Sequence, residues 1–233
     1  MKQTIKAIIP VRAGSQRVKN KNIKPFANSN LLEIKINQLK ELPQLDGIIV
    51  NSDSDEMLDI AKKLGTETVK RNAYYASSSV AINEVYVDLA NHCDSDIILF
   101  ADVTNPLIKK ETISNVIDFY FNNNDKYDSV NTVNSIKMFL WRDGKPINYT
   151  EEAKPRSQDL PDIYAINSAI NVLSKDTMIN CRAFVGKKPY LYQVDNIEGI
   201  DIDNEIDFEF AEFLYKKIKS LKMLDTTDSA GGG

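Results

Sequence analysis

The chain has 233 residues, 42% of them hydrophobic, which is enough apolar material for the core of one α/β domain. Its formal net charge of -4 argues against general nucleic-acid binding, because that function needs a broadly basic surface. Two cysteines, Cys93 and Cys181, and the single histidine, His92, have no metal-ligand spacing and indicate neither a zinc site nor a disulfide framework.

The start of the chain combines a predicted strand with a cationic loop. Ile5 to Pro10 is an apolar, β-rich run bounded by a turn signal, which is typical of a central parallel strand. Ligands of open α/β sheets bind beyond the carboxyl ends of such strands. The loop that follows carries four cations: Arg12, Arg17, Lys19 and Lys21. They can hold a polyphosphate by charge and by forked hydrogen bonds, although a solvated charge run is the alternative interpretation.

Phosphate loops that bind through backbone do not fit this segment. The dinucleotide fingerprint needs three spaced glycines and the P-loop needs GxxxxGK[ST], whereas Gly14 is the only glycine in the loop. A dehydrogenase is therefore disfavoured, and side chains rather than backbone are expected to bind the phosphates.

Helix and strand patterns then alternate along the chain. Helices are predicted over 31–42, 57–64 (with Gly65 as its stop), 83–91 and 111–121. Strands are predicted over 48–50, around 68–69, and over 96–100 and 129–133. This order predicts an α/β, three-layer Rossmann-like fold with a mostly parallel central sheet.

A hairpin follows in the segment MFLWRDGKPINYT, residues 138–150. Two short strands are predicted around Asp143-Gly144, the strongest local hairpin signal in the chain. Phe139 and Trp141 give it large apolar faces, and exposed aromatic area of this size usually finds a partner. An ordinary surface hairpin is the alternative interpretation.

The segment IEGIDIDNEID, residues 197–207, carries paired carboxylates. In a strand, Asp201 and Asp203 would point to one face, and Ile200 and Ile202 would point to the other. Two like charges repel unless a cation joins them, and hard oxygen ligands suit magnesium bound together with substrate phosphates. Alternatively, an aspartate caps the helix that begins near Glu205 and closes the fold over 207–221.

Three motifs, spread from Ile5 to about Leu214, resemble the acylneuraminate cytidylyltransferase (CMP-sialic acid synthetase) family. The family's N-terminal IIPAR-x-GS-x-R and KN pair are matched by Pro10, Arg12, Gly14, Ser15, Arg17, Lys21 and Asn22, with Val11 replacing the alanine. The R-x-Q-x-LP motif and the asparagine segment after it are matched by Arg156, Gln158, Leu160, Pro161, Tyr164 and Asn167. The family's DID segment is matched by residues 201–203.

The resemblance implies a CTP-dependent nucleotidyltransferase that transfers CMP to a hydroxyl of an acidic sugar and releases pyrophosphate. It implies catalytic roles for Lys21, Arg12 and Asp203. It implies nucleotide binding by Arg12, Ala13, Gly14, Ser15, Arg17, Lys21, Asn22, Arg71 and Ser79, although Ser79 could equally be a helix N-cap. Acceptor binding is implied for Thr104, Arg156, Gln158, Tyr164 and Asn167. A magnesium or manganese ion is implied at Asp201, Asp203 and Asp102.

Two departures from the family pattern leave the acceptor open. Asp102 replaces the glutamine of the usual QPTSP, and the related Kdo cytidylyltransferases carry a magnesium-binding aspartate near this position. An Asx-type turn is the alternative role for this residue. Ala165 stands where many members have an arginine, which would hold an acceptor carboxylate. The acceptor is thus a sialic acid or related nonulosonic acid, or alternatively a Kdo-like or other acidic sugar.

The same resemblance implies a homodimer, because the family's inserted hairpin reaches across to a second subunit. We expect one cytidylyltransferase domain over 1–224, with 138–160 as the inserted dimerisation segment and 225–233 as a flexible tail or a remnant of cloning. No stretch is apolar for long enough to span a bilayer, and we expect a cytoplasmic protein without membrane or nucleic-acid partners. A nucleotide sensor that has lost turnover is the rival from another class; retention of Lys21 and of both aspartates in 201–203 disfavours it.

Overall fold

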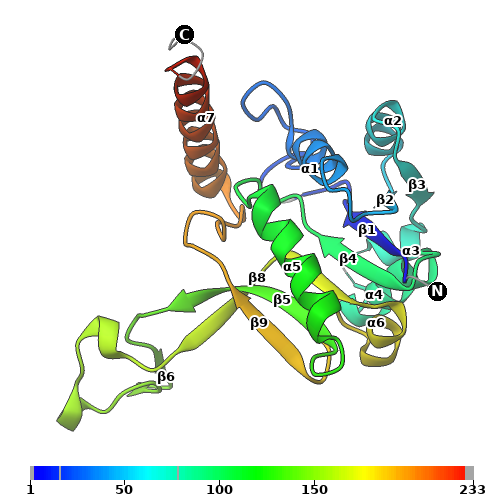
Figure 1. The fold of residues 1–233 in the computed structure, drawn as a ribbon. Helices are drawn as coiled ribbons and strands as arrows, with labels where there is room; N and C mark the ends of the chain where they lie inside the picture. The colour runs from blue at the N-terminus through cyan, green and yellow to red at the C-terminus, as the bar shows by residue number, and fades with distance from the viewer. Residues whose placement is uncertain (1–2, 16, 78, 229–233) are drawn as a thin grey trace.

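A seven-stranded sheet runs through the molecule in the order β3-β2-β1-β4-β8-β5-β9 (Figure 1). The computed structural model describes residues 3–15, 17–77 and 79–228, with 222–228 as backbone. The strands are β1 (Ile5–Pro10), β2 (Gly47–Ser52), β3 (Glu67–Lys70), β4 (Ile97–Ala101), β5 (Ser129–Ile136), β8 (Ile163–Ser174) and β9 (Pro189–Gln193). Neighbouring strands are parallel except where β8 pairs antiparallel with both β4 and β5. The predicted mostly parallel sheet is confirmed.

Helices cover both faces of the sheet, which confirms the three-layer prediction. They are α1 (Leu31–Lys40), α2 (Asp55–Lys63), α3 (Ala73–Ala76), α4 (Ile82–Asn91), α5 (Lys110–Asn123), α6 (Lys175–Cys181) and α7 (Glu205–Asp228). Alternate residues of β1 point to opposite faces. Ile5, Ala7 and Ile9 pack in one core with α1, α2, α5 and α7, whereas Ile8 packs in a second core with α4 and α6.

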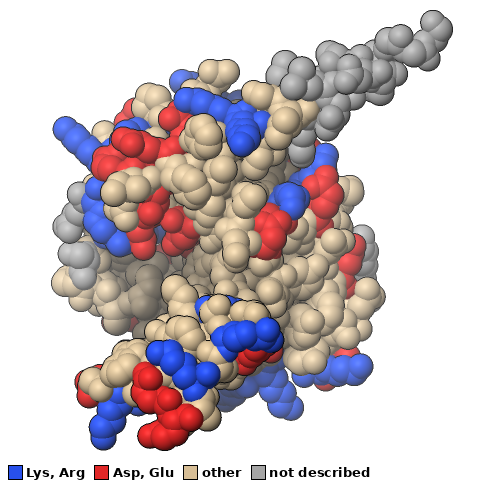
Figure 2. Space-filling view, turned by 90° about the vertical axis from the view of Figure 1, so that its left-hand side faces the viewer, with Lys and Arg blue, Asp and Glu red and all other residues tan. Residues whose placement is uncertain are grey.

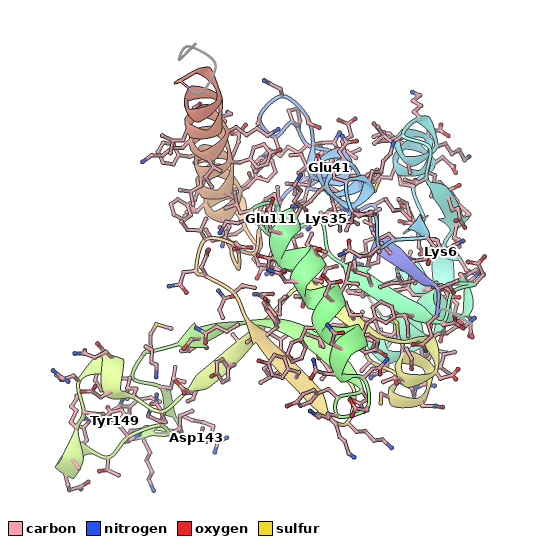
Figure 3. The ribbon with its side chains drawn as sticks, viewed as in Figure 1. Lys6, Lys35, Glu41, Glu111, Asp143 and Tyr149 are labelled. Carbon is pink, nitrogen blue, oxygen red and sulfur yellow. The ribbon has the colours of Figure 1, made fainter. Side chains whose placement is uncertain are left out.

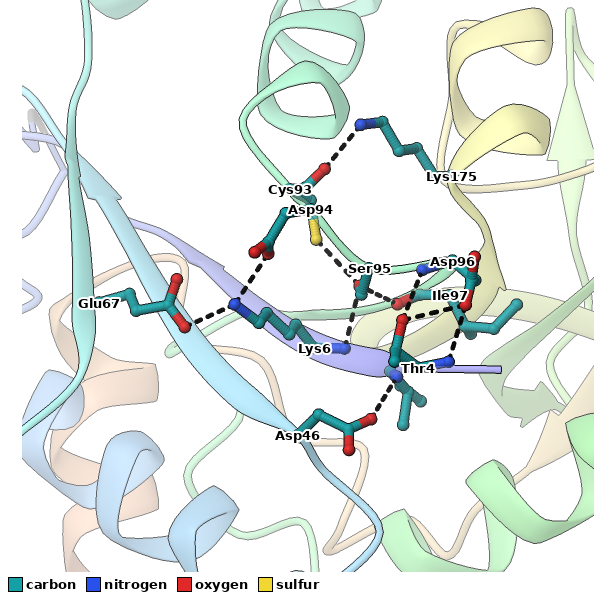
Figure 4. Close-up of polar contacts among 11 residues, drawn as sticks. Thr4, Lys6, Asp46, Glu67, Cys93, Asp94, Ser95, Asp96, Ile97 and Lys175 are labelled. Carbon is teal, nitrogen blue, oxygen red and sulfur yellow. Dashed lines mark hydrogen bonds and ion pairs between the residues drawn. The ribbon is translucent and has the colours of Figure 1, made fainter. Parts of the chain in front are cut away.

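Paired polar groups close the amino end of β1. The ammonium of Lys6 lies 2.7 Å from a carboxylate oxygen of Glu67 and 2.8 Å from one of Asp94 (Figure 4). The carboxylates of Asp46 and Asp96 accept hydrogen bonds from the backbone N–H groups that begin the strand. The polar groups at this end are therefore engaged with one another, and the strand is fixed before it reaches its loop.

An arm formed by residues 137–163 leaves the sheet from β5 and returns as β8 (Figures 1 and 3). It contains β6 (Trp141–Arg142), β7 (Lys145–Pro146) and the short 3₁₀ helices η1 (Glu151–Ala153) and η2 (Ser157–Asp159). The turn at Asp143-Gly144 has positive φ at both residues, +52° and +75°, as a two-residue hairpin turn requires. The predicted hairpin is confirmed.

The apolar side chains of the arm form a small cluster of their own. The rings of Phe139 and Tyr149 lie 4.9 Å apart, and Lys154 lies 5.0 Å from the centre of the Phe139 ring. The Trp141 indole N–H donates to the Tyr149 hydroxyl at 2.8 Å, yet the tryptophan is 55% exposed. The arm is thus ordered internally while it presents aromatic surface to solvent.

Residues 200–203 differ from prediction, because they form a loop between β9 and α7 and pair with no strand of the described sheet. The expected alternation survives: Ile202 is fully buried, whereas Asp201 and Asp203 are exposed. Two hydrogen bonds of Ile202 hold the segment, its N–H to the Thr104 carbonyl at 3.0 Å and its carbonyl to the ammonium of Lys21.

The capping alternative for the aspartate pair is wrong. The Asn204 side chain accepts hydrogen bonds from the N–H groups of Ile206 and Asp207, at 2.9 and 3.1 Å. Asp207 in turn accepts from the N–H groups of Asp203 and Asn204, both at 3.0 Å, which completes a reciprocal cap. The carboxylates of 201 and 203 are therefore free of this structural duty.

Two further details correct the sequence analysis. The N-cap of α4 is Ala81, so the N-cap alternative for Ser79 is wrong. The last helix continues to Asp228, so residues 225–228 are helical; 229–233 lie outside the described residues. Among the helices of the described chain, none is both long and apolar enough to cross a membrane.

Candidate functional site

A cavity of about 420 Å³ opens where β1 and β4 end, at the place predicted for a ligand. The loop after β1 contributes Pro10, Arg12, Ser15, Arg17, Val18, Lys21 and Asn22 to its wall. The turn after β4 contributes Asp102, Val103 and Thr104, and the segment before α7 contributes Asp203. Cations of one segment therefore face carboxylates of two others.

The cationic loop is held by a few anchors. The Ala13 N–H donates to the Asp53 carboxylate at 2.9 Å, and the Asn22 side chain donates to the Arg12 carbonyl at 3.2 Å. Val18 is 1% exposed and ties the middle of the loop to the core. Gly14 has φ +74°, a conformation that side chains disfavour, which accounts for a glycine here. The backbone is thus fixed while the charged side chains project into the cavity.

Lys21 is the most enclosed cation of the loop. Its ammonium donates to the Ile202 carbonyl, and desolvation lowers the pKa of Lys21 while Asp201 and Asp203 act to raise it. Arg17 lies 2.8 Å from Asp203, but both side chains are mostly exposed, at 69% and 53%. A pair of that kind contributes little to stability, so the arginine can exchange its carboxylate for a phosphate at small cost.

The carboxylates resist ionisation. Burial raises the pKa of Asp102 to about 7, Asp201 adds to the rise, and Lys35 and Lys21 oppose it. Desolvation also raises the pKa of Asp201, with the charge of Asp203 adding to it and Thr104 opposing. Carboxyls that repel one another in a partly dry site are stabilised by a cation that binds between them.

The three aspartates fit a divalent ion only as part of its ligand set. Within residues 3–15, 17–77 and 79–228, no three Asp, Glu, His or Cys side chains are grouped closely enough to hold a metal by themselves. The predicted site of Asp102, Asp201 and Asp203 is therefore incomplete without other oxygens. Magnesium commonly binds through one or two carboxylates plus substrate phosphates, and the hard oxygen donors present here suit that arrangement.

Lys35 of α1, labelled in Figure 3, is a buried cation whose charge interacts with that of Asp102, and it was missed by sequence reasoning. It is fully buried, its ammonium donates to the Asn105 carbonyl at 3.1 Å, and burial lowers the pKa of Lys35 to about 7, with Asp102 opposing. The Asn105 side chain donates to the Ile200 carbonyl at 3.1 Å. Lys35 thus holds the segment after β4, and Asn105 joins that segment to the one before α7. The sequence pattern that could have revealed it is its spacing: Lys35 lies four residues from both Leu31 and Leu39, which places it on the apolar side of the helix.

Four predicted nucleotide-binding residues lie outside the cavity wall. Arg71 is 6% exposed and donates to the side chain and carbonyl of Asn51, at 2.6 and 3.1 Å. Ser79 lies near the loop, with its hydroxyl 2.7 Å from that of Ser77. Ala13 and Gly14 contribute backbone shape rather than lining. Arg12 joins the two regions, because its guanidinium donates to the Ala76 carbonyl at 3.3 Å.

Among the predicted acceptor residues, only Thr104 lines the cavity. Arg156 and Gln158 lie on the arm, where Arg156 pairs with Asp159 at 2.7 Å. Tyr164 is 38% exposed on β8. Asn167 is buried and engaged, since its carbonyl accepts from Thr132 at 2.7 Å and its amide donates to Asn134 at 2.8 Å. A single chain therefore does not bring these residues to the cavity.

Comparison with known proteins identifies the family of this chain. A family model described as "Cytidylyltransferase" matches residues 6–224. Post-translational flagellin modification protein B of Campylobacter coli is 29% identical over 93% of this chain and 97% of its own length. CMP-N,N'-diacetyllegionaminic acid synthase of Campylobacter jejuni is 26% identical over 94% of this chain and 97% of its own.

The fold recurs in a solved structure. CMP:2-keto-3-deoxy-manno-octonic acid synthetase, solved with CTP, superposes with a TM-score of 0.68 over 92% of this chain and 99% of its own, at 11% identity. At that identity the likeness concerns the fold alone. The expected family resemblance is confirmed by the family match and the sequence relatives.

The raised pKa of Asp102 predicts a signature in stability. Between its ordinary value of 3.8 and about 7, the folded chain keeps a proton that the unfolded chain has released. The free energy of unfolding contributed by this group therefore falls as pH rises through that window. Asp102→Asn removes this loss. As pH rises through the window, the free energy of unfolding of the variant should therefore increase relative to that of the wild type, by up to about 1.4 kcal/mol per pH unit in urea titrations.

Asp94→Asn is the matched control. Lys6 lowers the pKa of Asp94 below its ordinary value of 3.8, so the stability that this group contributes is lost only as pH falls below about 4. From pH 4 to 7 this variant should therefore run parallel to the wild type. If Asp102→Asn runs parallel to the wild type from pH 4 to 7, the carboxyl is not held protonated.

Proposed function

The chain belongs to the cytidylyltransferase family, and from this we propose that it transfers CMP from CTP to a hydroxyl of a nonulosonic acid, releasing pyrophosphate. The observation that carries the proposal is the cavity at the ends of β1 and β4, where Arg12, Arg17 and Lys21 face Asp102 and Asp203. A triphosphate needs such cations, and a sugar hydroxyl must then approach its α-phosphorus from the carboxylate side. We further propose that the enzyme works in the cytoplasm as a homodimer.

The loop residues have distinct parts in this proposal. Arg12 and Arg17 bind phosphate oxygens through forked hydrogen bonds, and Ser15 and Asn22 add donors to the same wall. Lys21 releases the Ile202 carbonyl and places its ammonium on the phosphates, where charge builds as pyrophosphate leaves. Because the loop is anchored at Ala13 and Val18, these donors need little rearrangement.

Asp203 and Asp201, with Asp102, would hold a magnesium or manganese ion together with the triphosphate. When bound, such an ion supplies charge neutralisation and a lowered pKa of the attacking hydroxyl. The raised pKa of Asp201 and of Asp102 supports this assignment, because both groups gain from a cation. Thr104, whose backbone holds Ile202, keeps the carboxylates opposite the loop.

The acceptor side of the proposal requires the arm. Arg156, Gln158 and Tyr164 lie away from their own cavity, so we propose that the arm delivers them to the cavity of a second subunit. The exposed aromatic surface around Trp141 and the mixed charges of the arm (Figure 2) fit a protein contact. Asn167 would act indirectly, by fixing the strand from which the arm returns.

A pyrophosphate-release assay tests the function. CTP with each of several nonulosonic acids should release pyrophosphate, whereas ATP, GTP and UTP should not. Preference for Kdo over every nonulosonic acid would establish the alternative acceptor, which Asp102 and Ala165 favour. Tight CTP binding without turnover on any acid would indicate a nucleotide sensor instead.

Lys21→Ala should lower kcat about a hundredfold or more while the free energy of unfolding changes little. Lys19→Ala is the matched control, because Lys19 is an exposed cation of the same loop that does not line the cavity. Steady-state kinetics and urea titrations on both variants check the prediction. Equal kcat in the two variants would show that Lys21 does not act on the phosphates.

Metal and nucleotide should bind cooperatively. Carboxylates that repel one another bind a lone divalent ion weakly, and CTP supplies the missing oxygens. Each ligand must then raise the affinity of the other by the same factor. Calorimetric titration of CTP with and without magnesium should show this enhancement in the wild type and lose it in Asp203→Asn. Equal enhancement in both proteins would place the metal elsewhere.

Trp141→Ala should weaken self-association through the arm, because it removes a large apolar side chain that is 55% exposed. Ile82→Ala on α4, which is 56% exposed and far from the arm in sequence, is the control. Sedimentation equilibrium measures both. A wild type that is monomeric at micromolar concentration would contradict the arm-mediated dimer.

A further inference from the structure

The last helix, α7, has apolar residues on two faces. Its inner face packs on the body: Phe208 and Ala211 are buried, and the Phe26 ring lies 5.3 Å from that of Phe208 and 5.4 Å from that of Tyr215. Its outer face carries a second stripe of large apolar side chains at helical spacing. These are Ile206, Phe210, Phe213 and Leu221, which are 79%, 52%, 60% and 53% exposed.

We refer to these four residues as the outer stripe. They lie within one narrow arc of the helix, since successive members are separated by four, three and eight residues. Four exposed large hydrophobic side chains in a row are unusual for a surface that faces only water. The helix also projects from the body in a different direction from the arm of the same chain (Figure 1).

The charges of α7 are divided between its halves. The first turns hold Glu205, Asp207, Glu209 and Glu212, and the following turns hold Lys216, Lys217 and Lys219. Several of them are used internally: Glu205 pairs with Lys24, Asp207 completes the cap, and Glu212 pairs with Lys216. Among the residues the structure describes, Glu209 and Lys217 have no ion-pair partner. Lys217 lies within the arc of the outer stripe, between Phe213 and Leu221, and Glu209 lies beside the stripe.

The outer stripe is nearly palindromic about Phe213. Glu209 stands four residues before it and Lys217 four after, while Ile206 stands seven before and Leu221 eight after. An antiparallel copy of the same helix, centred on Phe213, would therefore place Phe213 against Phe213 and Glu209 against Lys217. Ile206 would lie within one residue of Leu221, and Phe210 would lie against the stem of Lys216. The ion pair would occur twice, as a two-fold axis requires.

We propose that the outer stripe of α7 is an interface with a second copy of this chain, packed as an antiparallel helix pair. Aligned apolar side chains and complementary charges both select this occupant over an unrelated partner. The seam spans about 22 Å at 1.5 Å per residue, so the contact is smaller than a standard interface and should be reversible. The proposal is independent of the catalytic function.

Cysteine cross-linking tests the pairing and its direction. In a Cys181→Ser background, Ile206→Cys and Leu221→Cys proteins are prepared separately and mixed under mild oxidation. The mixture should give disulfide-linked dimers, whereas each protein alone should give little. Efficient cross-linking of Ile206→Cys with itself would overturn the antiparallel arrangement. Cross-linking of either cysteine to Met138→Cys on the arm, in place of the helix pair, would identify the arm as the occupant.

Charge reversal provides the second part of the test. Glu209→Lys or Lys217→Glu alone places like charges opposite each other, and should lower the yield of the mixed dimer about threefold or more. The double reversal restores both pairs and should restore the yield. Both positions are exposed, so the variants should fold normally. Circular dichroism checks this. A double variant no better than the singles, or absence of the mixed dimer in the parent proteins at high concentration, would overturn the proposal.

Discussion

Opposite charges that have lost part of their water govern this structure. Lys21 and Lys35 approach Asp102 and Asp201 in surroundings where burial weakens the charged form of every one of the four. Charges that have lost part of their water are stabilised by opposite charges nearby, so each set stabilises the charged form of the other. The anchors of the cationic loop and the contacts of Asn105 hold the two sets in place. The cavity is the space left between them.

The sequence predicted best where pattern and environment coincide. From Ala7 to Ile9, β1 is apolar on both faces because both faces are covered, and a continuous apolar run indicates that condition. Predictions failed where a tertiary contact replaced the local rule. Residues 200–203 alternate like a strand, but they are held by Thr104 and Lys21 rather than by a neighbouring strand. Asn204, rather than either aspartate, caps the last helix. The sequence indication of this cap, which was overlooked, is the acidic residue Asp207 three positions after Asn204.

The same division applies to the site. The cations of the loop, with Asp102 and Asp203, could be predicted because each follows a strand or opens a helix at one edge of the sheet. The buried contacts behind the site could not be predicted, because they join residues distant in sequence: Arg71 donates to Asn51, and Lys35 donates to Asn105. Acceptor residues such as Arg156 were placed by resemblance alone. In one chain Thr104 lines the cavity, whereas Arg156, Gln158, Tyr164 and Asn167 do not.

The position of β8 has a consequence for the newly made chain. It enters the sheet between β4 and β5 and pairs with both, so the edge of β4 stays open until residues 163–174 have been synthesised. The sheet β3-β2-β1-β4 and its cationic loop can form first, while Asp201 and Asp203 arrive near the end. During translation the early half therefore presents an unpaired hydrophobic strand edge beside an uncompensated cluster of cations. That interval is when the chain most needs protection from aggregation.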